Sequence, residues 1–219
     1  PSHFSSSQRQ YVQDACFSAG IEVLQLLNST SAAALALCSR RLAATTGKPV
    51  RRSPFRTMLV CNLGATIEVA TITVEIASRL KVKAVAADKN NGGDHFTRLL
   101  VDHFVDELKA DHDKDISTDP AALNLLRIAC VRAKKTISNY SQAPIELKEL
   151  GFYSTITRAK FEKICAPSFR ATLDLVQTAV RPSPEEIEVD EIVLVGGSSR
   201  VPMLQKMLLD AFPNQEHTN

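Results

Sequence analysis

Apolar residues along this chain follow two spacings, and each spacing predicts one kind of secondary structure. Short runs of aliphatic and β-branched residues, bounded by glycine or polar clusters, predict strands. These runs lie at 21–27, 57–61, 66–77, 80–87, 145–147, 152–156 and 192–195. Elsewhere apolar residues recur three and four positions apart, which predicts helices with one buried face. The helices are expected at 8–18, 29–37, 94–112, 119–138, from 157 onward and at 198–212. This order of strands and helices predicts an α/β fold.

The three consecutive strands between residues 57 and 87 are joined by tight turns. Such a run is typical of an antiparallel meander within a mixed sheet. Hydroxyl or carboxylate residues stand before most of the expected helices, where they can accept hydrogen bonds from free backbone N–H groups. The expected caps are Ser5–Ser7, Asp94, Asp119, Thr157 and the pair Ser198 and Ser199. Gly20 is expected to end the first helix.

The segment 191–212 combines a buried strand, a glycine turn and an amphipathic helix. Gly196 and Gly197 break the strand, and Pro202 lies in the first turn of the helix. A glycine pair at this position lets a phosphate or a ribose approach backbone N–H groups at a positive helix end. A glycine turn between strand and helix is also a common tight connection with no ligand. Both interpretations stay open on this feature alone.

Composition narrows the class of protein. A formal net charge of +2 and a charged fraction of 23% argue against a chain built around nucleic acid. The five cysteines include no C-x-x-C pair, which is typical of reduced thiols in the cytosol, so we expect a cytoplasmic protein. The most apolar span, 58–77, contains Asn62, Glu68 and Glu75 and predicts strands, not a membrane helix. No secretory segment is visible, and because the chain begins at Pro1 we expect a processed or cut piece.

The segment 39–56 carries six cationic residues without apolar periodicity. We expect a solvated connector here, although a basic contact surface for an acidic partner or ribosomal RNA is the alternative. His95 and His103 are eight positions apart without a second ligand at helical spacing, so packed or surface histidines are expected. The acidic run at 111–115 lacks the glycine and distal glutamate of a calcium loop.

Long motifs along the chain resemble a known family. The phrase VLVGGSSRVPMLQ at 193–205 is similar to the adenosine-binding strand, turn and helix of the 70-kilodalton heat-shock chaperones. Four more segments carry the resemblance, at 3–37, 83–117, 122–147 and 152–174. They begin HFSSSQRQY, KAVAADKNNGGD, ALNLLRIACVRAKK and FYSTITRAKFEKI in that order. The chain is therefore identified as a divergent member of this family.

The resemblance implies an actin-like, ribonuclease H-like ATPase fold, in which a mixed sheet carries a helical subdomain. It covers the end of the family's first lobe and nearly all of its second lobe. We expect a remnant of lobe I at 1–38, a basic connector at 39–56, and lobe II at 57–219 with an outer subdomain at about 90–181. The family's first phosphate loop and catalytic lysine are expected before Pro1, and its peptide-binding domain beyond Asn219.

The resemblance also implies an adenosine pocket. One side of it is the glycine turn with Gly196, Gly197, Ser198 and Arg200. The other side is a helix stripe that contains Lys134, Lys135 and Ser138. On that stripe Lys135 replaces an arginine that stacks on adenine, and Val131 replaces a glutamate that binds ribose. Lysine is a poorer stacking partner than a guanidinium group and valine makes no hydrogen bond, so we expect weak nucleotide affinity.

The phosphate and magnesium end departs further from the family pattern. Gly64 and Thr66 match a phosphate loop that is one glycine short here, and Gly92, Gly93 and Asp94 match a second turn near the phosphates. Three positions with catalytic roles in the family are degenerate. They are Ser29 for a glutamate, Asn62 for a magnesium-binding aspartate and Glu68 for a second aspartate. Loss of carboxylates weakens a magnesium site, so we expect ATP or ADP as ligand with Mg²⁺ held weakly.

Two main functions follow from the resemblance. In the first, the chain is part of the ATPase domain of a chaperone that couples its nucleotide state to binding of unfolded peptides. Its partners would then be a J-domain co-chaperone and a nucleotide-exchange factor, with no membrane and no nucleic acid. In the second, the chain is an inactive pseudo-ATPase scaffold that acts as a co-chaperone or ribosome-associated partner. A small-molecule kinase of the same fold is disfavoured, because the helices between 94 and 180 match the chaperones.

Overall fold

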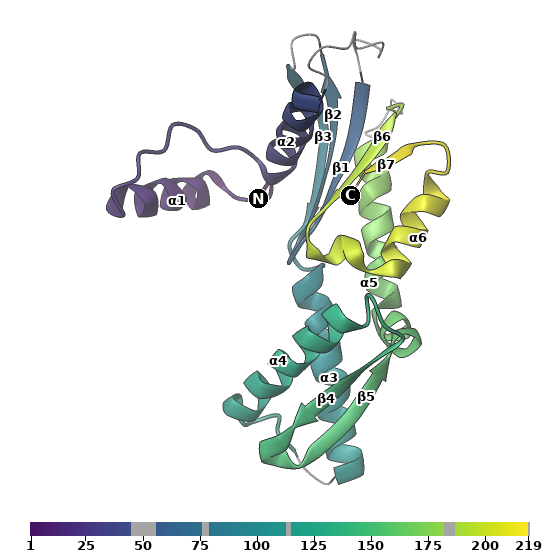
Figure 1. Ribbon diagram of the computed structural model, residues 1–219. Helices are drawn as coiled ribbons and strands as arrows, with labels where there is room; N and C mark the ends of the chain where they lie inside the picture. Colours follow the sequence, from purple (N-terminus) through teal and green to yellow (C-terminus); the bar gives the residue numbers. More distant parts are fainter. Residues whose placement is uncertain (45–55, 76–78, 113–114, 182–186, 219) are drawn as a thin grey trace.

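The computed structural model describes residues 1–44, 56–75, 79–112, 115–181 and 187–218 (Figure 1). Its centre is a five-stranded sheet in the order β3-β2-β1-β6-β7. The strands are β1 (Arg56–Leu63), β2 (Ile67–Val74), β3 (Leu80–Asp88), β6 (Glu191–Val195) and β7 (Glu216–Thr218). The first three form an antiparallel meander, whereas β6 runs parallel to β1 and β7 parallel to β6. The prediction of a meander in a mixed sheet is therefore confirmed.

Helices cover both faces of this sheet because side chains along each strand point alternately to its two sides. Met58 and Val60 of β1 pack with Ala34 of α2 (Ser29–Ala44) on one face. Leu59 and Cys61 belong to the larger core on the other face. That core includes α5 (Arg158–Val180) and α6 (Pro202–Ala211). The sheet is thus the middle layer of a three-layer α/β structure.

A second unit extends below the sheet in Figure 1. It contains α3 (Gly93–His112), α4 (Pro120–Thr136) and a hairpin of β4 (Gln142–Leu147) and β5 (Phe152–Thr157), joined by the short helix η2 (Lys148–Leu150). Its core is rich in phenylalanine. Phe96 of α3 and Phe169 of α5 meet edge to face with ring centroids 5.2 Å apart, a favoured aromatic geometry. α3 and α5 therefore pack against each other, and α5 also contacts β2 and β3 of the sheet.

Three of the helix caps that the sequence predicts are confirmed. Ser5 forms a capping box with Gln8 at the start of α1 (Ser6–Ser18). Asp119 accepts hydrogen bonds from two backbone N–H groups of α4, and Thr157 accepts one from α5.

Two cap predictions are wrong. α3 begins at Gly93, so Asp94 lies in its first turn and is not its cap. Ser198 and Ser199 lie in a separate short helix, η3 (Gly197–Arg200), and α6 begins only at Pro202 without a side-chain cap. The hydroxyl of Ser199 turns back to the carbonyl of Gly196 instead, at 2.7 Å. The serines therefore stabilise the turn and not the helix.

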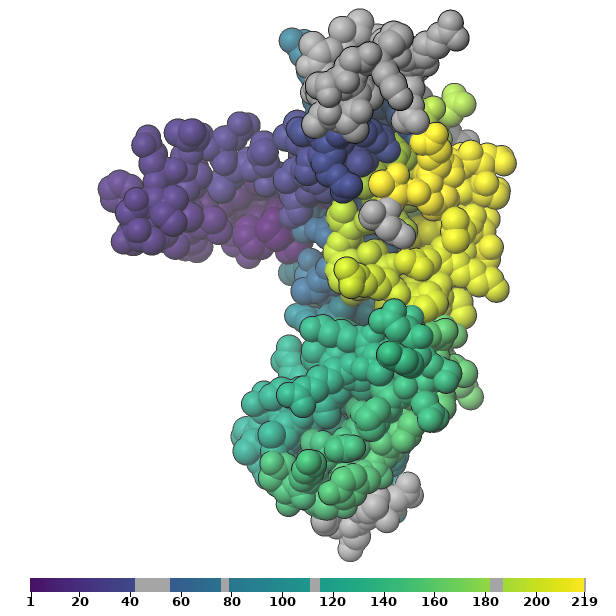
Figure 2. Space-filling model, viewed as in Figure 1, coloured from purple at the N-terminus to yellow at the C-terminus, as the bar shows by residue number. Residues whose placement is uncertain are grey.

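The N-terminal arm stands away from the sheet, as the ribbon and the space-filling view both show (Figures 1 and 2). No residue of α1 is buried. The strand predicted at 21–27 is wrong, since residues 21–28 have no regular structure and no described strand lies beside them. Leu24 is 91% exposed. A strand needs a hydrogen-bonded neighbour, which the described part of the chain does not supply here.

The predicted connector at 39–56 is only partly solvated. α2 continues to Ala44, beyond the predicted end at residue 37. Arg41 and Arg56 both bind the buried carboxylate of Glu191, so they are structural cations. The rest of the basic run, 45–55, and residues 113 and 114 of the predicted acidic run lie outside the described residues. No helix in the described ranges is long and apolar enough to cross a membrane.

Candidate functional site

Three turns meet at the carboxyl ends of the parallel strands β1 and β6. The β1–β2 turn contributes Gly64, the turn before α3 contributes Gly93, and the turn after β6 contributes Ser198. The N–H of Gly93 donates to the carbonyl of Gly64 at 2.9 Å. The Ser198 hydroxyl donates to the same carbonyl at 3.1 Å. Ligands of open α/β sheets bind at this edge, so the three-turn junction is the candidate site.

Two glycines make this close approach of the turns possible. Gly196 has φ of 89°, and a β-carbon there would lie 2.5 Å from the carbonyl oxygen of Leu63. Gly92 has φ of 134°, and its β-carbon would lie 2.5 Å from the carbonyl oxygen of Ala65. Only glycine combines positive φ with the absence of a side chain. Gly197, in contrast, is exposed with open space around its α-carbon, which leaves room for a ligand.

Lys134 of α4 joins the junction to the helical unit. Its ammonium group donates to the carbonyl of Gly93 and to the hydroxyl of Thr97 at 2.8 Å. Burial lowers the pKa of Lys134, and the nearby carboxylate of Asp94 opposes this shift. An ammonium group has three N–H donors. The two bonds leave one donor for a ligand at the junction.

Two residues that position the junction were not singled out from the sequence. Thr97 donates to the Gly93 carbonyl at 3.0 Å. Asn91 is buried, and its amide nitrogen donates to the carbonyl of Ser168 in α5 at 2.9 Å, while its oxygen accepts from Gly92 N–H. The only signal for Thr97 was its place one helical turn after Gly93. Asn91 looked like an ordinary turn residue, because its partner is 77 positions away.

The remaining candidates for the adenosine side lie around the junction. Ser138 is half-buried, and its hydroxyl donates to the Lys134 carbonyl at 3.3 Å. Lys135 and Arg200 are exposed. Neither side chain forms a hydrogen bond or ion pair with another described residue. Both are therefore available to solvent or to a ligand.

The residues at the expected magnesium end do not fit a metal site. Asn62 and Glu68 lie opposite each other on β1 and β2. Glu68 is 2% exposed and accepts a hydrogen bond from the backbone N–H of Ser2 at 2.9 Å. Ser29 is half-buried at the start of α2. Within the described ranges no group of three or more His, Cys, Asp and Glu residues can hold a metal ion. Mg²⁺ prefers ionised carboxylates, and here one is an amide and the other is buried.

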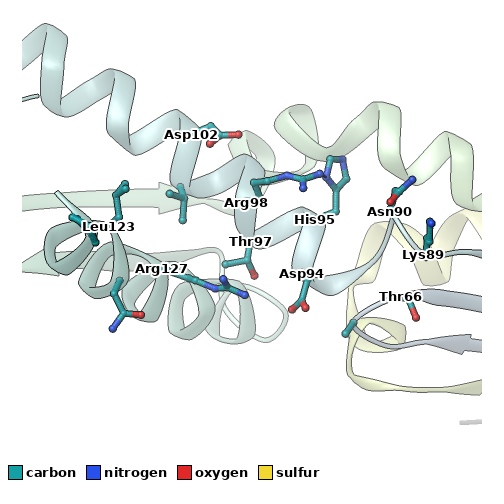
Figure 3. A pocket seen from close by; sticks show the side chains of 14 residues that line it. Thr66, Lys89, Asn90, Asp94, His95, Thr97, Arg98, Asp102, Leu123 and Arg127 are labelled. Carbon is teal, nitrogen blue, oxygen red and sulfur yellow. Dashed lines mark hydrogen bonds between the residues drawn. The ribbon is translucent and has the colours of Figure 1, made fainter. Parts of the chain in front are cut away.

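A groove of about 640 Å³ opens beside the junction, between α3 and α4 (Figure 3). Its walls combine polar and charged side chains with apolar ones, and one end of it is the β1–β2 turn. The lining residues are Ala65, Thr66, Lys89, Asn90, Asp94, His95, Thr97, Arg98, Val101, Asp102, Pro120, Leu123, Asn124 and Arg127. Of these only Thr66 and Asp94 were expected in the site. Arg98 and Arg127 come from helix faces that the sequence pattern marks as solvent-exposed.

His95 lies in this groove as a hydrogen-bonding residue. Arg98 approaches the Nδ1 atom of His95 at 2.6 Å (Figure 3). Burial and then the charge of Arg98 lower the pKa of His95, so the ring is neutral at pH 7. A neutral ring accepts the hydrogen bond and leaves the guanidinium charge of Arg98 uncompensated.

The whole chain, residues 1–219, matches the family model described as Hsp70 protein. It is 40% identical over 222 residues to Heat shock 70 kDa protein 2 of Paracoccidioides lutzii, with 99% of the chain and 32% of the relative covered. It is 41% identical over 218 residues to a Heat shock 70 kDa protein of Emericella nidulans, with 97% of the chain and 32% of the relative covered. It is 35% identical over 221 residues to Heat shock cognate 70 kDa protein 3 of Dictyostelium discoideum, with 99% of the chain and 34% of the relative covered. The chain spans about a third of the length of these relatives.

Proposed function

Because this chain belongs to the Hsp70 family, we propose that its three-turn junction is the adenosine half of an ATP/ADP site in a heat-shock 70-type chaperone. The chain has the actin-like ATPase fold of that family, with a mixed sheet and a helical unit. We assign residues 1–38 to the end of lobe I and 57–219 to lobe II. The helical unit, at about 90–181, is then the outer subdomain of lobe II.

The contact of Gly64, Gly93 and Ser198 carries this proposal. Ser198, which follows the exposed Gly196 and Gly197, and the half-buried ammonium group of Lys134 both lie beside Gly93. Ribose hydroxyls can accept the remaining N–H of Lys134, and adenine can lie on the open side of Gly197. Arg200, Lys135 and Ser138 would surround the base. Glycine turns serve such sites because backbone can approach a ligand closely.

ATP hydrolysis is not part of the proposal, because the charged side chains that this reaction needs are missing or already bonded. A serine hydroxyl at position 29 carries no charge that would orient a water molecule. Asn62 is neutral, and Glu68 is committed to the N–H of Ser2. These features favour a second candidate function, a pseudo-ATPase that keeps the fold as a scaffold for a co-chaperone or ribosome-associated role.

In the full-length protein we propose that nucleotide state is coupled to binding of unfolded peptides in the cytoplasm. A J-domain co-chaperone and a nucleotide-exchange factor would be its partners. These proposals rest on family membership, since the chain spans about a third of its relatives.

Calorimetric titration of the chain with adenosine, ADP and ATP tests the proposal. Saturable binding is expected, and Gly197→Leu should abolish it, because that position has space for a side chain that would then fill the ligand's place. Thr178→Leu, on the exposed side of α5, is the matched control. Equal thermal unfolding midpoints establish that both variants fold. A folded protein that binds none of the three ligands at millimolar concentration would contradict the nucleotide function and leave the scaffold function.

A further inference from the structure

The groove between α3 and α4 lies next to the adenosine junction, because Ala65 and Asp94 in its lining directly follow Gly64 and Gly93 in the chain. Thr97 lines the groove and also accepts a hydrogen bond from Lys134, which contacts Gly93 in the junction. Thr66, from the β1–β2 turn, lines the same groove. A ligand at the junction that reaches Thr66 would therefore enter the groove. Its volume of about 640 Å³ lies in the range of ordinary small-molecule sites.

Two cations in the groove have no partner among the residues that the structure describes. The side chains of Arg127 and Lys89 form no hydrogen bond or ion pair with any residue in the described ranges. Arg127 comes from α4 and Lys89 from the turn before α3, so they approach the groove from different elements (Figure 3). Unpaired cations that converge on one cavity favour an anionic ligand.

The formal charges of the residues that line the groove sum to a positive value, which also favours an anionic ligand. Lys89, Arg98 and Arg127 face two carboxylates, those of Asp94 and Asp102, which leaves a net charge of +1 (three minus two). His95 adds no charge at pH 7, because its pKa is lowered by burial. The expected magnesium end has less negative charge than the family pattern, because Asn62 is neutral where that pattern has an aspartate. Cationic side chains therefore outnumber carboxylates beside the phosphate turn, and within the described ranges no group of three or more His, Cys, Asp and Glu residues can hold a metal ion there.

We propose that this groove binds the polyphosphate chain of the nucleotide directly, without a divalent metal ion. The inference rests on the proposed function for the identity of the nucleotide. Arg127 and Arg98 present planar guanidinium groups that can bind phosphate oxygens in pairs, and Lys89 adds a point charge. Thr66 donates its hydroxyl at the end formed by the β1–β2 turn. The carboxylates of Asp94 and Asp102, which also line the groove, would lower the affinity for an anion.

Titration of the wild-type chain with ATP in EDTA and in excess Mg²⁺ is the first test. The two dissociation constants are expected to agree within about threefold, because arginine and lysine supply the counter-charge. A loss of more than about tenfold in EDTA would overturn the inference, since a metal-held phosphate chain needs the metal. Sodium tripolyphosphate should displace ATP in either buffer, and failure to do so would also overturn it.

Variants separate the groove from the junction. Arg127→Ala should weaken ATP binding about tenfold and leave adenosine binding unchanged, as one charged hydrogen-bonding group is lost. Asp102→Asn should strengthen ATP binding. Arg132→Ala is the matched control, because Arg132 is an exposed arginine of the same helix that does not line the groove. An Arg127→Ala protein with wild-type ATP affinity would contradict the proposal.

The failure of this inference differs from the failure of the proposed function. If adenosine binds but ATP binding needs Mg²⁺ or ignores Arg127, only the groove proposal fails. If neither adenosine nor ATP binds, the nucleotide function fails, and tripolyphosphate then probes the groove alone. Tripolyphosphate binding that Arg127→Ala removes supports an anion site, and its absence overturns that site as well.

Discussion

The carboxylate of Glu191 is fully buried at the start of β6 and accepts hydrogen bonds from the guanidinium group of Arg41, one of them at 2.7 Å. This contact joins α2 to the sheet across 150 positions of sequence. Arg56 of β1 and Thr218 of β7 bind the same carboxylate. One acidic side chain therefore holds a helix and three strands together.

Replacement of this acid should destabilise the fold. Glu191→Gln keeps the shape of the side chain but leaves two arginines beside an amide. Removal of one partner from a buried ion pair costs about 3–5 kcal/mol, and the partial exposure of Arg41 reduces the expected loss to about 2–3 kcal/mol. Urea unfolding followed by circular dichroism measures this difference. Glu188→Gln, an exposed acid nearby, should change it by less than about 0.5 kcal/mol.

The same carboxylate should make stability depend on pH. Burial alone would raise the pKa of Glu191, but hydrogen bonds from Arg41 and Thr218 and the charge of Arg56 outweigh it and lower the pKa below 4.5. The unfolded state then binds the proton more readily, so the stabilisation is present above about pH 4.5 and is lost as the pH falls through the folded-state pKa. The gap in unfolding free energy between wild type and Glu191→Gln should narrow in that acid range. A gap that stays constant from pH 7 to about pH 3 would contradict this linkage.

Gly196 and Gly197 are adjacent in the chain, but only Gly197 should tolerate substitution by alanine. Gly196→Ala should cost about 1–3 kcal/mol of unfolding free energy, because positive φ is strained for alanine. Its β-carbon would also meet the Leu63 carbonyl. Gly197→Ala should be neutral, since nothing lies near its β-carbon. Thermal unfolding of the two variants makes the comparison, and equal midpoints would show that the turn is not as tight as described.

Sequence patterns predicted elements wherever burial and periodicity agree locally. The aliphatic run at 192–195 became the buried strand β6, and the apolar stripe predicted along 94–112 became the buried face of α3. The pattern failed at 21–27, because an aliphatic run forms a strand only beside another strand. β7 was missed, since three residues, Glu216–Thr218, carry no readable pattern. Their pairing with β6 is decided by tertiary contact.

The candidate site shows the same division between local and distant information. Glycine turns have a local signature, so Gly64, Gly93 and Gly196 could be proposed from the sequence. Arg127 could not, because its place in the groove depends on how α4 packs against α3, and an exposed arginine looks the same in every helix. Motifs therefore locate the backbone of the site, and packing chooses the charged side chains around it.

Lys134→Met should separate ligand binding from folding. The variant loses the bonds to Gly93 and Thr97, but the Gly93 carbonyl still accepts the Thr97 hydroxyl. We expect about 1 kcal/mol of destabilisation and about a tenfold loss of adenosine affinity, because a charged donor to ribose is removed. Calorimetry and thermal unfolding measure the two effects. Lys135→Met is the control for stability, since Lys135 is exposed; unchanged adenosine binding by Lys134→Met would contradict the role of the ammonium group.

The chain should show no ATP turnover, and a single substitution should not restore it. Asn62→Asp returns one carboxylate, but Glu68 remains buried against the N–H of Ser2 and Ser29 still carries no charge. Activation of the attacking water needs a general base or a metal-bound hydroxide. The degenerate positions provide neither the base nor the ligands for such a metal ion. Phosphate release from ATP, measured for wild type and for Asn62→Asp, is expected to equal the no-protein control. Release above that control, abolished by Gly197→Leu, would mean that groups outside the degenerate positions supply the chemistry, and the scaffold function would then lose its main support.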